Sequence, residues 1–433
     1  MTDPAGRAAA AVALSIQQLF YVFLPAMPHP QERSSLRSMA RLPRHLRNAI
    51  AAHPRGSMLI LLACLLALLL TDVAVAWPYV LARLQALAVL DRVAGKPVPN
   101  ALAWIVSYPV QRTDLMLPLP GGAIRARLYT PLNRPQAPGV VIVHGVHSKG
   151  IDEPRIITFA SAMASSGLRV LTPELPDIKD YHVGANSIAD IGDSAVWLDH
   201  ATGDRPVGII GISFSGSLSL LAAAEPRYRP VIRFVTAIGA EDQMSRVANY
   251  YLTGRESRPD GTVEILPPHE YGALVLEYEN LQDFVPAPDL TAVRLVLREH
   301  LYEDRPAQRA AMARLTPRQA AEARQLMDTS SPVTRRMIAA SNALHLAAMA
   351  AVSPAGHMNS LATPVYLLSG QADNIIPSAE TQWLVREIPH GEVKMALISP
   401  VISHIDMNDQ KPTFRDQWRL VHFFALIIRA AER

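Results

Sequence analysis

The spacing of hydrophobic and polar residues divides this chain into three kinds of segment. Residues 58–77 form an unbroken apolar run, MLILLACLLALLLTDVAVAW, in which Asp72 is the single charge. From about residue 114, short apolar or alternating stretches typical of strands take turns with amphipathic stretches typical of helices. Between residues 239 and 362 the strand-like stretches stop and the helical spacing continues alone. The pattern predicts an apolar segment, an α/β core and a helical insertion within that core.

The strand-like stretches predict a mostly parallel sheet with helices on both faces. Gly139–Val143 (GVVIV) and Val207–Ile212 (VGIIGI) are continuous apolar runs, as expected of strands buried on both faces. Ala123–Tyr129 alternates apolar and polar residues, which favours a strand near an edge of the sheet. Other predicted strands are 168–171, 233–238, 364–368 and 393–398, and predicted core helices are 154–166, 187–200, 215–224 and 412–429. Strands and helices in alternation are typical of the α/β class.

The insertion has the pattern of a helical cap. Its helical stretches include Leu290–Leu301, Pro317–Asp328 and Val333–Val352. Connections this long usually carry their own structure, and α/β sheets bind ligands at the carboxyl ends of their strands, so we expect a cap there. The expected organisation is a basic, largely irregular extension (1–57), the apolar segment (58–77), a linker or helical segment (78–113), a core in two parts (114–238 and 363–433) and the cap (239–362).

The apolar run predicts a transmembrane helix. Its 20 residues, at ~1.5 Å each, span the ~30 Å hydrocarbon core of a bilayer. Basic residues gather before the run (Arg33, Arg37, Arg41, Arg44, Arg47 and Arg55), and fewer follow it closely (Arg83, Arg92 and Lys96). The positive-inside rule then predicts a single-pass anchor with the rest of the chain outside the cytoplasm, which in a Gram-negative bacterium is the periplasm.

Three alternatives to an uncleaved anchor remain for this run. It can be a buried core helix of a soluble protein. Ala74-Val75-Ala76 has the small-x-small pattern of a signal-peptide cleavage site. Cys64 follows Leu61-Leu62-Ala63 as a lipid-attachment cysteine does, although the apolar run continues past it. The length and uniformity of the run favour the anchor.

Composition narrows the function classes. The 433 residues are 49% hydrophobic, which is high for a soluble protein and agrees with a membrane segment. The formal net charge is +3, and most of the excess basic charge precedes residue 57, so no basic stripe with interleaved aromatic residues predicts a nucleic-acid partner. A single cysteine builds neither a disulfide framework nor a cysteine-based zinc site. No ligand spacing predicts another metal site.

The strongest candidate for chemistry is a serine at a predicted strand-to-helix turn, Gly211-Ile212-Ser213-Phe214-Ser215-Gly216. Acyl transfer needs a serine on a tight turn that projects its hydroxyl from the edge of the sheet. The residues two places before and after it must be small, and Gly211 and Ser215 meet this need. The turn aims the N-terminus of the following helix at the site, so the Phe214 N–H is a candidate oxyanion donor.

A histidine–glycine loop supplies the candidate second donor. His144-Gly145-Val146-His147 directly follows the predicted strand at 139–143. Such a loop provides a backbone N–H to the oxyanion hole, and we expect it from Val146, with His144 and Gly145 as supporting residues. His147 is either a substrate contact or a solvated loop residue.

Two later loops carry candidates for the acid and the base of a catalytic triad. Asp373 follows the predicted strand at 364–368, and His404 follows the one at 393–398. An imidazole there can take the serine proton, and a carboxylate can orient that imidazole. The order Ser213, Asp373, His404 is the order that this arrangement needs. Glu241 and Asp242 are alternative acids, and His390 and His422 are alternative histidines.

These residues resemble the α/β-hydrolase superfamily, from about Asp114 to the C-terminus. Ser213, Asp373 and His404 match its nucleophile, acid and base, and the His-Gly pair after a buried strand matches its oxyanion loop. The second glycine of the usual serine motif is replaced here by Ser215.

The resemblance is nearest to the esterase and dienelactone-hydrolase-like branches. It is carried by residues 138–175 and by the Gly-x-x-Asp-x-x-x-Pro turn at 370–377. Those branches hydrolyse esters, thioesters and, less often, amides without a metal or organic cofactor. The resemblance therefore implies an α/β-hydrolase fold and no cofactor.

The sequence as a whole predicts a membrane-anchored, outward-facing serine hydrolase for a small or lipid-like acyl substrate. A carboxylic ester or thioester is the expected bond. One alternative is a peptidase or amidase of the same fold, whose cap would hold a substrate amino terminus with Glu270 or Glu277. The other is a non-catalytic binding module on a hydrolase fold.

Overall fold

The computed structural model describes residues 54–403 and 412–433, which fall into two compact units divided between Val75 and Ala76. The first 53 residues of the expected basic extension lie outside the described residues.

Helix α3 (Pro54–Val93) contains the predicted membrane segment. It is 40 residues long and passes through Pro78 without ending. Its stretch Leu65–Val93 is long and apolar enough to cross a membrane, judged by length and composition alone. Leu66 and Leu69 are exposed, as side chains facing lipid would be. The helix fits the predicted anchor and continues past the predicted end at residue 77.

The C-terminal part of α3 packs into the core of the globular unit, in the segment where the sequence predicted a linker or a helix. Ala82, Ala86 and Val89 are buried in one hydrophobic cluster with the core. The side-chain amide of Gln85 donates to the carbonyl oxygen of Ser166 at 2.7 Å. This spacing of buried residues is that of one face of a helix, so the last turns of α3 belong to the core.

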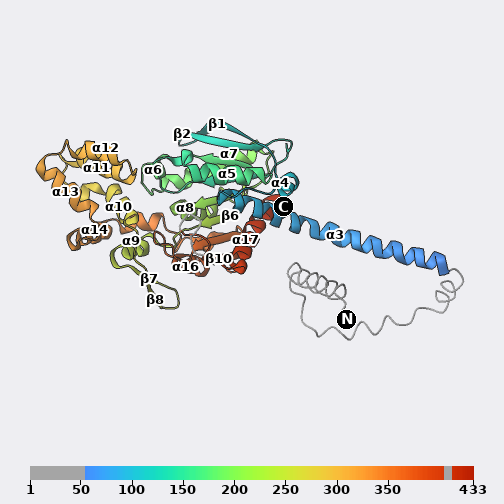
Figure 1. Cartoon of the computed structure of the whole chain (residues 1–433). Helices are drawn as coiled ribbons and strands as arrows, with labels where there is room; N and C mark the ends of the chain where they lie inside the picture. The colour runs from blue at the N-terminus through green and yellow to red at the C-terminus, as the bar shows by residue number, and fades with distance from the viewer. Residues whose placement is uncertain (1–53, 404–411) are drawn as a thin grey trace, which may run out of the picture. The chain divides into compact units, whose positions relative to one another are not determined.

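Eight strands form one mixed sheet in the order β1-β2-β4-β3-β5-β6-β9-β10 (Figure 1). The β1–β2 and β2–β4 pairs are antiparallel, and the other five pairs are parallel. The predicted, mostly parallel sheet is therefore confirmed. The strands are β1 (Val110–Leu119), β2 (Gly122–Pro131), β3 (Gly139–Val143), β4 (Arg169–Pro173), β5 (Val207–Ile212), β6 (Ile232–Ile238), β9 (Val365–Gly370) and β10 (Val393–Ser399).

Helices cover both faces of the sheet. Along β3, Val140 and Ile142 face one hydrophobic cluster, and Val141 and Val143 face the other, which explains the continuous apolar run. The first cluster includes residues of α5 (Pro154–Ser165), α17 (Phe414–Glu432) and the end of α3, and the second those of α7 (Asn186–Ala201), α8 (Phe214–Ala224) and α16 (Ala379–Glu387). The short helices α4 (Asn100–Val106) and α6 (Pro176–Lys179) lie in connections.

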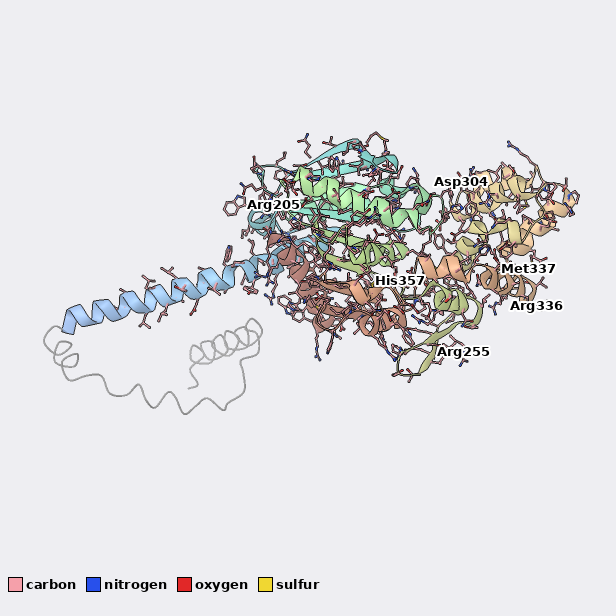
Figure 2. The ribbon with its side chains drawn as sticks, turned by 180° about the vertical axis from the view of Figure 1, so that it is seen from behind. Arg205, Arg255, Asp304, Arg336, Met337 and His357 are labelled. Carbon is pink, nitrogen blue, oxygen red and sulfur yellow. The ribbon has the colours of Figure 1, made fainter. Side chains whose placement is uncertain are left out.

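The insertion after β6 forms a helical layer with one small hairpin. Its elements are α9 (Met244–Thr253), β7 (Arg255–Ser257), β8 (Val263–Ile265), α10 (Glu270–Glu279), α11 (Leu290–Leu301), α12 (Arg305–Met312), α13 (Pro317–Met327), α14 (Pro332–Leu344) and α15 (Leu346–Ala351). Asp304, Arg336 and Met337 lie in this layer, and Arg205 lies on the sheet-bearing part (Figure 2). Buried residues of α10 and α11 join the cluster that covers one face of the sheet, so the cap shares its core.

Candidate active site

Ser213 occupies the turn between β5 and α8 in a backbone conformation that side chains rarely adopt. Its φ is 59° and its ψ is −140°, a region populated almost only by glycine. The Ser213 N–H donates to the carbonyl oxygen of Ile238 at 2.8 Å, which ties the turn to the end of β6. The residue is 5% exposed. Strain of this kind persists where the surroundings enforce it and is common at functional sites.

The small neighbours of Ser213 are explained by crowding inside the turn. A Cβ atom on Gly211 would lie 2.5 Å from Ser219 Oγ and 2.6 Å from the Gly216 Cα, so only glycine fits. Ser215 is buried and donates its hydroxyl to the carbonyl oxygen of His144 at 2.6 Å. The serine that departs from the usual glycine thus links the turn to the loop after β3.

That loop lies against Ser213. A Cβ on Gly145 would be 3.1 Å from the Ser213 Cβ and 3.8 Å from its Oγ, so the glycine permits this close approach. Val146 follows Gly145 and is buried. Phe214 directly follows Ser213 and begins α8. The structure therefore brings Gly145, Val146 and Phe214 to the same end of β5 as Ser213.

His144 supports the loop and is held neutral. The Leu175 N–H donates to His144 Nε2 at 3.1 Å, so the proton is assigned to Nδ1, which donates to the carbonyl oxygen of Gly145 at 2.8 Å. Burial lowers the His144 pKa to about 4. His147 Nδ1 accepts the Lys149 N–H at 3.1 Å, and burial lowers its pKa too.

Asp373 is buried in the loop after β9. Its Oδ1 accepts the N–H groups of Ile375 at 3.0 Å and Ile376 at 2.9 Å, which fixes the carboxylate. His404 lies outside the described residues, but the residue before it does not. A Cβ on Gly370, at the end of β9, would overlap the carbonyl oxygen of Ser403 and lie 2.7 Å from that of Ile402. The segment that leads to His404 therefore contacts the strand end that leads to Asp373.

Comparison with known proteins gives only distant similarities. No family model matches the chain, and no curated protein matches it in sequence. Similar solved structures include a 2,6-dihydroxy-pseudo-oxynicotine hydrolase (15% identity, TM-score 0.37), over 70% of this chain and 65% of that one. They also include the Pyrococcus horikoshii acylaminoacyl peptidase (13% identity, TM-score 0.41), over 78% of this chain and 43% of that one. A third is the esterase domain of a Rhodothermus marinus protein (14% identity, TM-score 0.40), over 74% of this chain and 98% of that one.

The chain spans less than two thirds of the length of the first two of these structures. With every TM-score below 0.5, the fold is decided by the sheet order and by the strained serine between β5 and α8. The chain has the α/β-hydrolase fold. Within this fold, the candidate residues Val146, Ser213 and Asp373 follow β3, β5 and β9, at the carboxyl ends of parallel strands. Residues 402–403, which lead to His404, follow β10.

The alternative acids stand in different surroundings from Asp373. Glu241 is fully buried, and burial raises its pKa well above the ordinary value. Asp242 Oδ2 accepts from Arg246 at 2.8 Å, and burial raises its pKa to about 6. Arg246 also pairs with Glu380 at 2.6 Å. Asp242 is therefore part of a buried ion-pair network that joins α9 to α16.

The alternative histidines lie elsewhere in the fold. His390 is in the turn before β10, at the amino end of that strand, whereas Ser213 is at the carboxyl end of the parallel β5. His422 lies within α17, and burial lowers its pKa.

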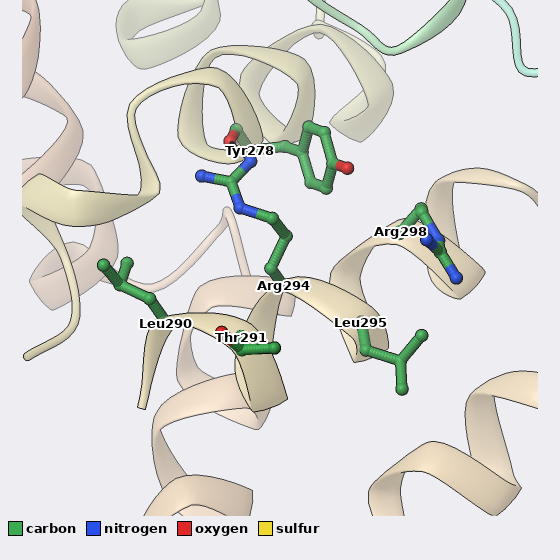
Figure 3. A pocket seen from close by; sticks show the side chains of 6 residues that line it. All are labelled: Tyr278, Leu290, Thr291, Arg294, Leu295 and Arg298. Atoms are coloured by element: carbon green, nitrogen blue, oxygen red, sulfur yellow. Dashed lines mark hydrogen bonds between the residues drawn. The ribbon is translucent and has the colours of Figure 1, made fainter. Parts of the chain in front are cut away.

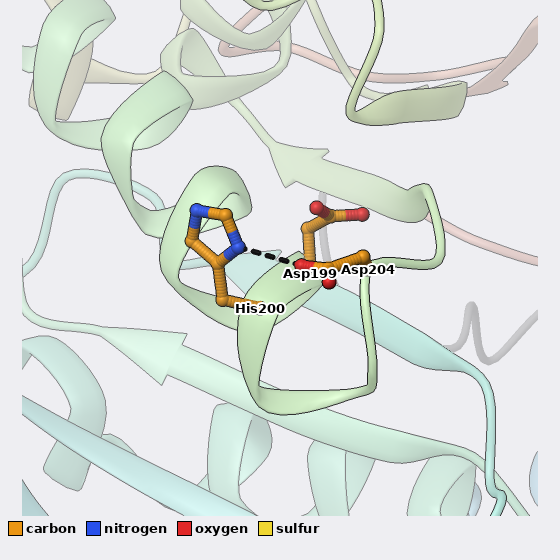
Figure 4. A group of neighbouring side chains, drawn as sticks. All are labelled: Asp199, His200 and Asp204. Atoms are coloured by element: carbon orange, nitrogen blue, oxygen red, sulfur yellow. Dashed lines mark hydrogen bonds and ion pairs between the residues drawn. The ribbon is translucent and has the colours of Figure 1, made fainter.

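Asp199, His200 and Asp204 place possible metal-ligand atoms within 4.8 Å of one another (Figure 4). His200 Nδ1 and Asp204 Oδ1 are 2.8 Å apart and exposed. Asp199 and His200 lie in the last turn of α7, and Asp204 lies in the loop before β5, at the opposite end of that strand from Ser213. Its geometry is that of an exposed ion pair.

Two tyrosines that the sequence did not single out contact the loop after β3. Tyr271, in α10 of the cap, donates its hydroxyl to the carbonyl oxygen of Val146 at 2.7 Å. Tyr181, after α6, accepts the Ser148 N–H at 3.3 Å. Neither contact has a local sequence signal, because each joins segments far apart in the chain.

Proposed function

We propose that the chain is a serine hydrolase that cleaves a carboxylic ester or thioester through an acyl-enzyme on Ser213. The Ser213 Oγ attacks the carbonyl carbon while His404 takes its proton, and Asp373 orients the imidazole. The N–H groups of Val146 and Phe214 stabilise the oxyanion. His404 then protonates the leaving alcohol or thiol, and water attacks the acyl-enzyme to release the acid and free Ser213.

The conformation of Ser213 carries this proposal. A serine held at φ 59° costs stability, and a purely structural role would be better filled by glycine. Gly145 lies against its side chain, and the Phe214 N–H begins the helix that follows. These features support an acyl-transfer site in preference to a non-catalytic binding module.

The peptidase alternative is less well supported by the cap carboxylates. Glu277 is fully buried, and burial raises its pKa to about 9, so at neutral pH it presents an uncharged acid. A neutral acid attracts a substrate ammonium group far less than a carboxylate does. Glu270, in the first turn of α10, is exposed. An ester or thioester therefore stays the proposed substrate class.

The proposal includes the location of the enzyme. Residues 58–77 anchor it in a membrane with the catalytic unit outside the cytoplasm, as the arginines before the run favour. In a Gram-negative bacterium this places the site in the periplasm. A site held near a bilayer suits a lipid-like acyl substrate.

The function is tested with the full-length chain in detergent and 4-nitrophenyl esters of graded acyl length, beside matched thioesters and anilides. We expect hydrolysis of esters or thioesters, and Ser213→Ala to lower kcat at least about 10⁴-fold. Ser330→Ala, an exposed serine of the cap, is the control and should keep wild-type rates. Full activity of Ser213→Ala, or cleavage of anilides alone, would overturn the proposal.

A further inference from the structure

Three successive carbonyl groups of the oxyanion loop each accept a hydrogen bond from a side chain. The His144 carbonyl accepts from Ser215 Oγ at 2.6 Å, and that of Gly145 accepts from His144 Nδ1 at 2.8 Å. The carbonyl of Val146 accepts from Tyr271 Oη at 2.7 Å. The first two donors belong to the core, and the third belongs to cap helix α10. The core thus holds the peptide that carries the Val146 N–H, through the Gly145 carbonyl, and the cap holds the next peptide, through the Val146 carbonyl.

A second tyrosine ties the same loop to another cap helix. Tyr181 Oη accepts the Ser148 N–H at 3.3 Å and donates to the carbonyl oxygen of Leu301, the last residue of α11, at 3.1 Å. The Tyr181 ring packs edge-on against Tyr271, with centroids 6.1 Å apart, and stacks on Tyr302 at 5.8 Å. The Tyr271 hydroxyl therefore links the loop to α10, and the Tyr181 hydroxyl links it to α11.

An oxyanion hole stabilises the transition state only if its donors already point at the developing charge. A loop whose carbonyls are fixed cannot rotate its peptides away from that direction. Because Tyr271 and Leu301 belong to the cap, the orientation of Val146 depends on how the cap sits on the core.

We propose that Tyr271 is a positioning residue of the oxyanion hole, and that with Tyr181 it makes the hole complete only when α10 and α11 are seated on the core. The inference rests on the proposed hydrolase function. Burial raises the pKa of Tyr271 well above its ordinary value, which keeps its hydroxyl protonated as a donor. Opening of the cap would release the Val146 carbonyl and lower activity without moving Ser213.

The test compares Tyr271→Phe with the wild type in the full-length chain. Wild-type protein is first shown to be labelled on Ser213 by a fluorophosphonate. For a hydrolysed 4-nitrophenyl ester we expect Tyr271→Phe to lower kcat about 10- to 100-fold, less than loss of a direct donor would. KM should stay within about twofold, because the ground state does not use the hole. The inhibition constant of a trifluoromethyl ketone, whose serine adduct places an oxyanion in the hole, should rise by about the same factor as kcat falls. Tyr181→Phe should act in the same direction.

Tyr278→Phe is the matched control on the same helix. Tyr278 also packs on Tyr181, with centroids 5.9 Å apart, but its hydroxyl donates to Asp180 Oδ1 at 3.4 Å. The Tyr278 side chain lines a pocket of about 300 Å³ on the cap, together with Arg294 and Arg298 (Figure 3). This variant should keep kcat and the inhibition constant near wild type.

Unchanged kcat in Tyr271→Phe would overturn the inference. A fall in kcat with no change in the inhibition constant, or with a matching loss of thermal stability, would assign Tyr271 a structural role instead. Absence of Ser213 labelling in the wild type would overturn the proposed function itself, and this inference with it.

Discussion

The strained backbone of Ser213 lowers stability, whereas the proposed chemistry needs a serine at this position. Its φ of 59° and ψ of −140° are open to glycine but costly for serine or alanine, by about 1–3 kcal/mol. Ser213→Gly should therefore be more stable than Ser213→Ala by about 1 kcal/mol, after the greater freedom of glycine in the unfolded chain is deducted. Both variants should be inactive. Thermal unfolding of the two variants measures the difference, and a less stable glycine variant would show that the turn is unstrained.

At this scale the sequence predicts residues whose roles are set by their immediate neighbours. Gly211, Ser213 and Ser215 could be predicted because a strand-to-helix turn restricts both size and order. Tyr271 could not, because its contact with Val146 spans 125 positions and depends on how α10 lies on the core. The hydroxyl role of Ser215 was missed for the same reason, since its partner is in the loop after β3.

Cap helix α10 contains a buried acid that lowers its stability. Neither carboxylate oxygen of Glu277 has a hydrogen-bond partner among the described residues, and burial raises its pKa to about 9. A folded-state pKa above the unfolded value means that this group favours folding least at high pH. Between the unfolded pKa of about 4.5 and the folded pKa of about 9, this group lowers the free energy of unfolding by ~1.4 kcal/mol for each unit of pH.

Glu277→Gln should therefore stabilise the chain at neutral and alkaline pH. Glutamine keeps the shape of the neutral acid and releases no proton on unfolding. We expect a higher Tm than wild type at pH 8 and a difference that shrinks towards zero at pH 4.5, measured by thermal unfolding at each pH. Glu270→Gln, an exposed acid of the same helix, is the control and should change little. A difference independent of pH would contradict the assigned ionisation.

At the scale of elements, long periodic segments were predicted well and short or polar ones were missed. β3 and β5 match their predicted bounds because both faces are apolar. β1 was missed since its sequence, VQRTDLMLPL, carries charges on an exposed edge strand. β7 and β8 have three residues each, too few to show a period. The last turns of α3 fall in the segment predicted as a linker or helix, but their packing on the core could not be predicted because the apolar run hides where a membrane-type helix becomes an amphipathic one.

At the scale of the whole molecule, the proposed membrane anchor in α3 gives a prediction of its own. Leu66 and Leu69 are exposed on the apolar helix, and an arginine at the bilayer centre costs ~2.5–3.5 kcal/mol. Replacing both with arginine should move the chain from the carbonate-resistant membrane fraction to the soluble or aggregated fraction. Leu344→Arg with Leu346→Arg, two exposed leucines of the cap, is the matched control and should stay in the membrane. Wild-type protein released by carbonate would contradict the anchor.

The α/β class and the mostly parallel sheet follow from patterns within the chain, whereas the contacts between cap and core do not. Strand and helix periods are local, so the sequence predicts the elements and their class. The seating of α10 and α11 on the core depends on side chains such as Tyr181, which contacts both helices and the loop after β3. Substrate specificity likewise depends on contacts between cap and core and does not follow from local patterns.

The central claim is that Ser213 is an activated nucleophile. The most direct measurement is to incubate the full-length chain in membranes with a fluorophosphonate and to map the modified residue by mass spectrometry. We expect one adduct, on Ser213. The rate at which it forms should fall at least about 10³-fold in His404→Ala and should also fall in Asp373→Asn. An adduct on another serine, or a folded wild-type protein that stays unmodified in the membrane, would contradict it.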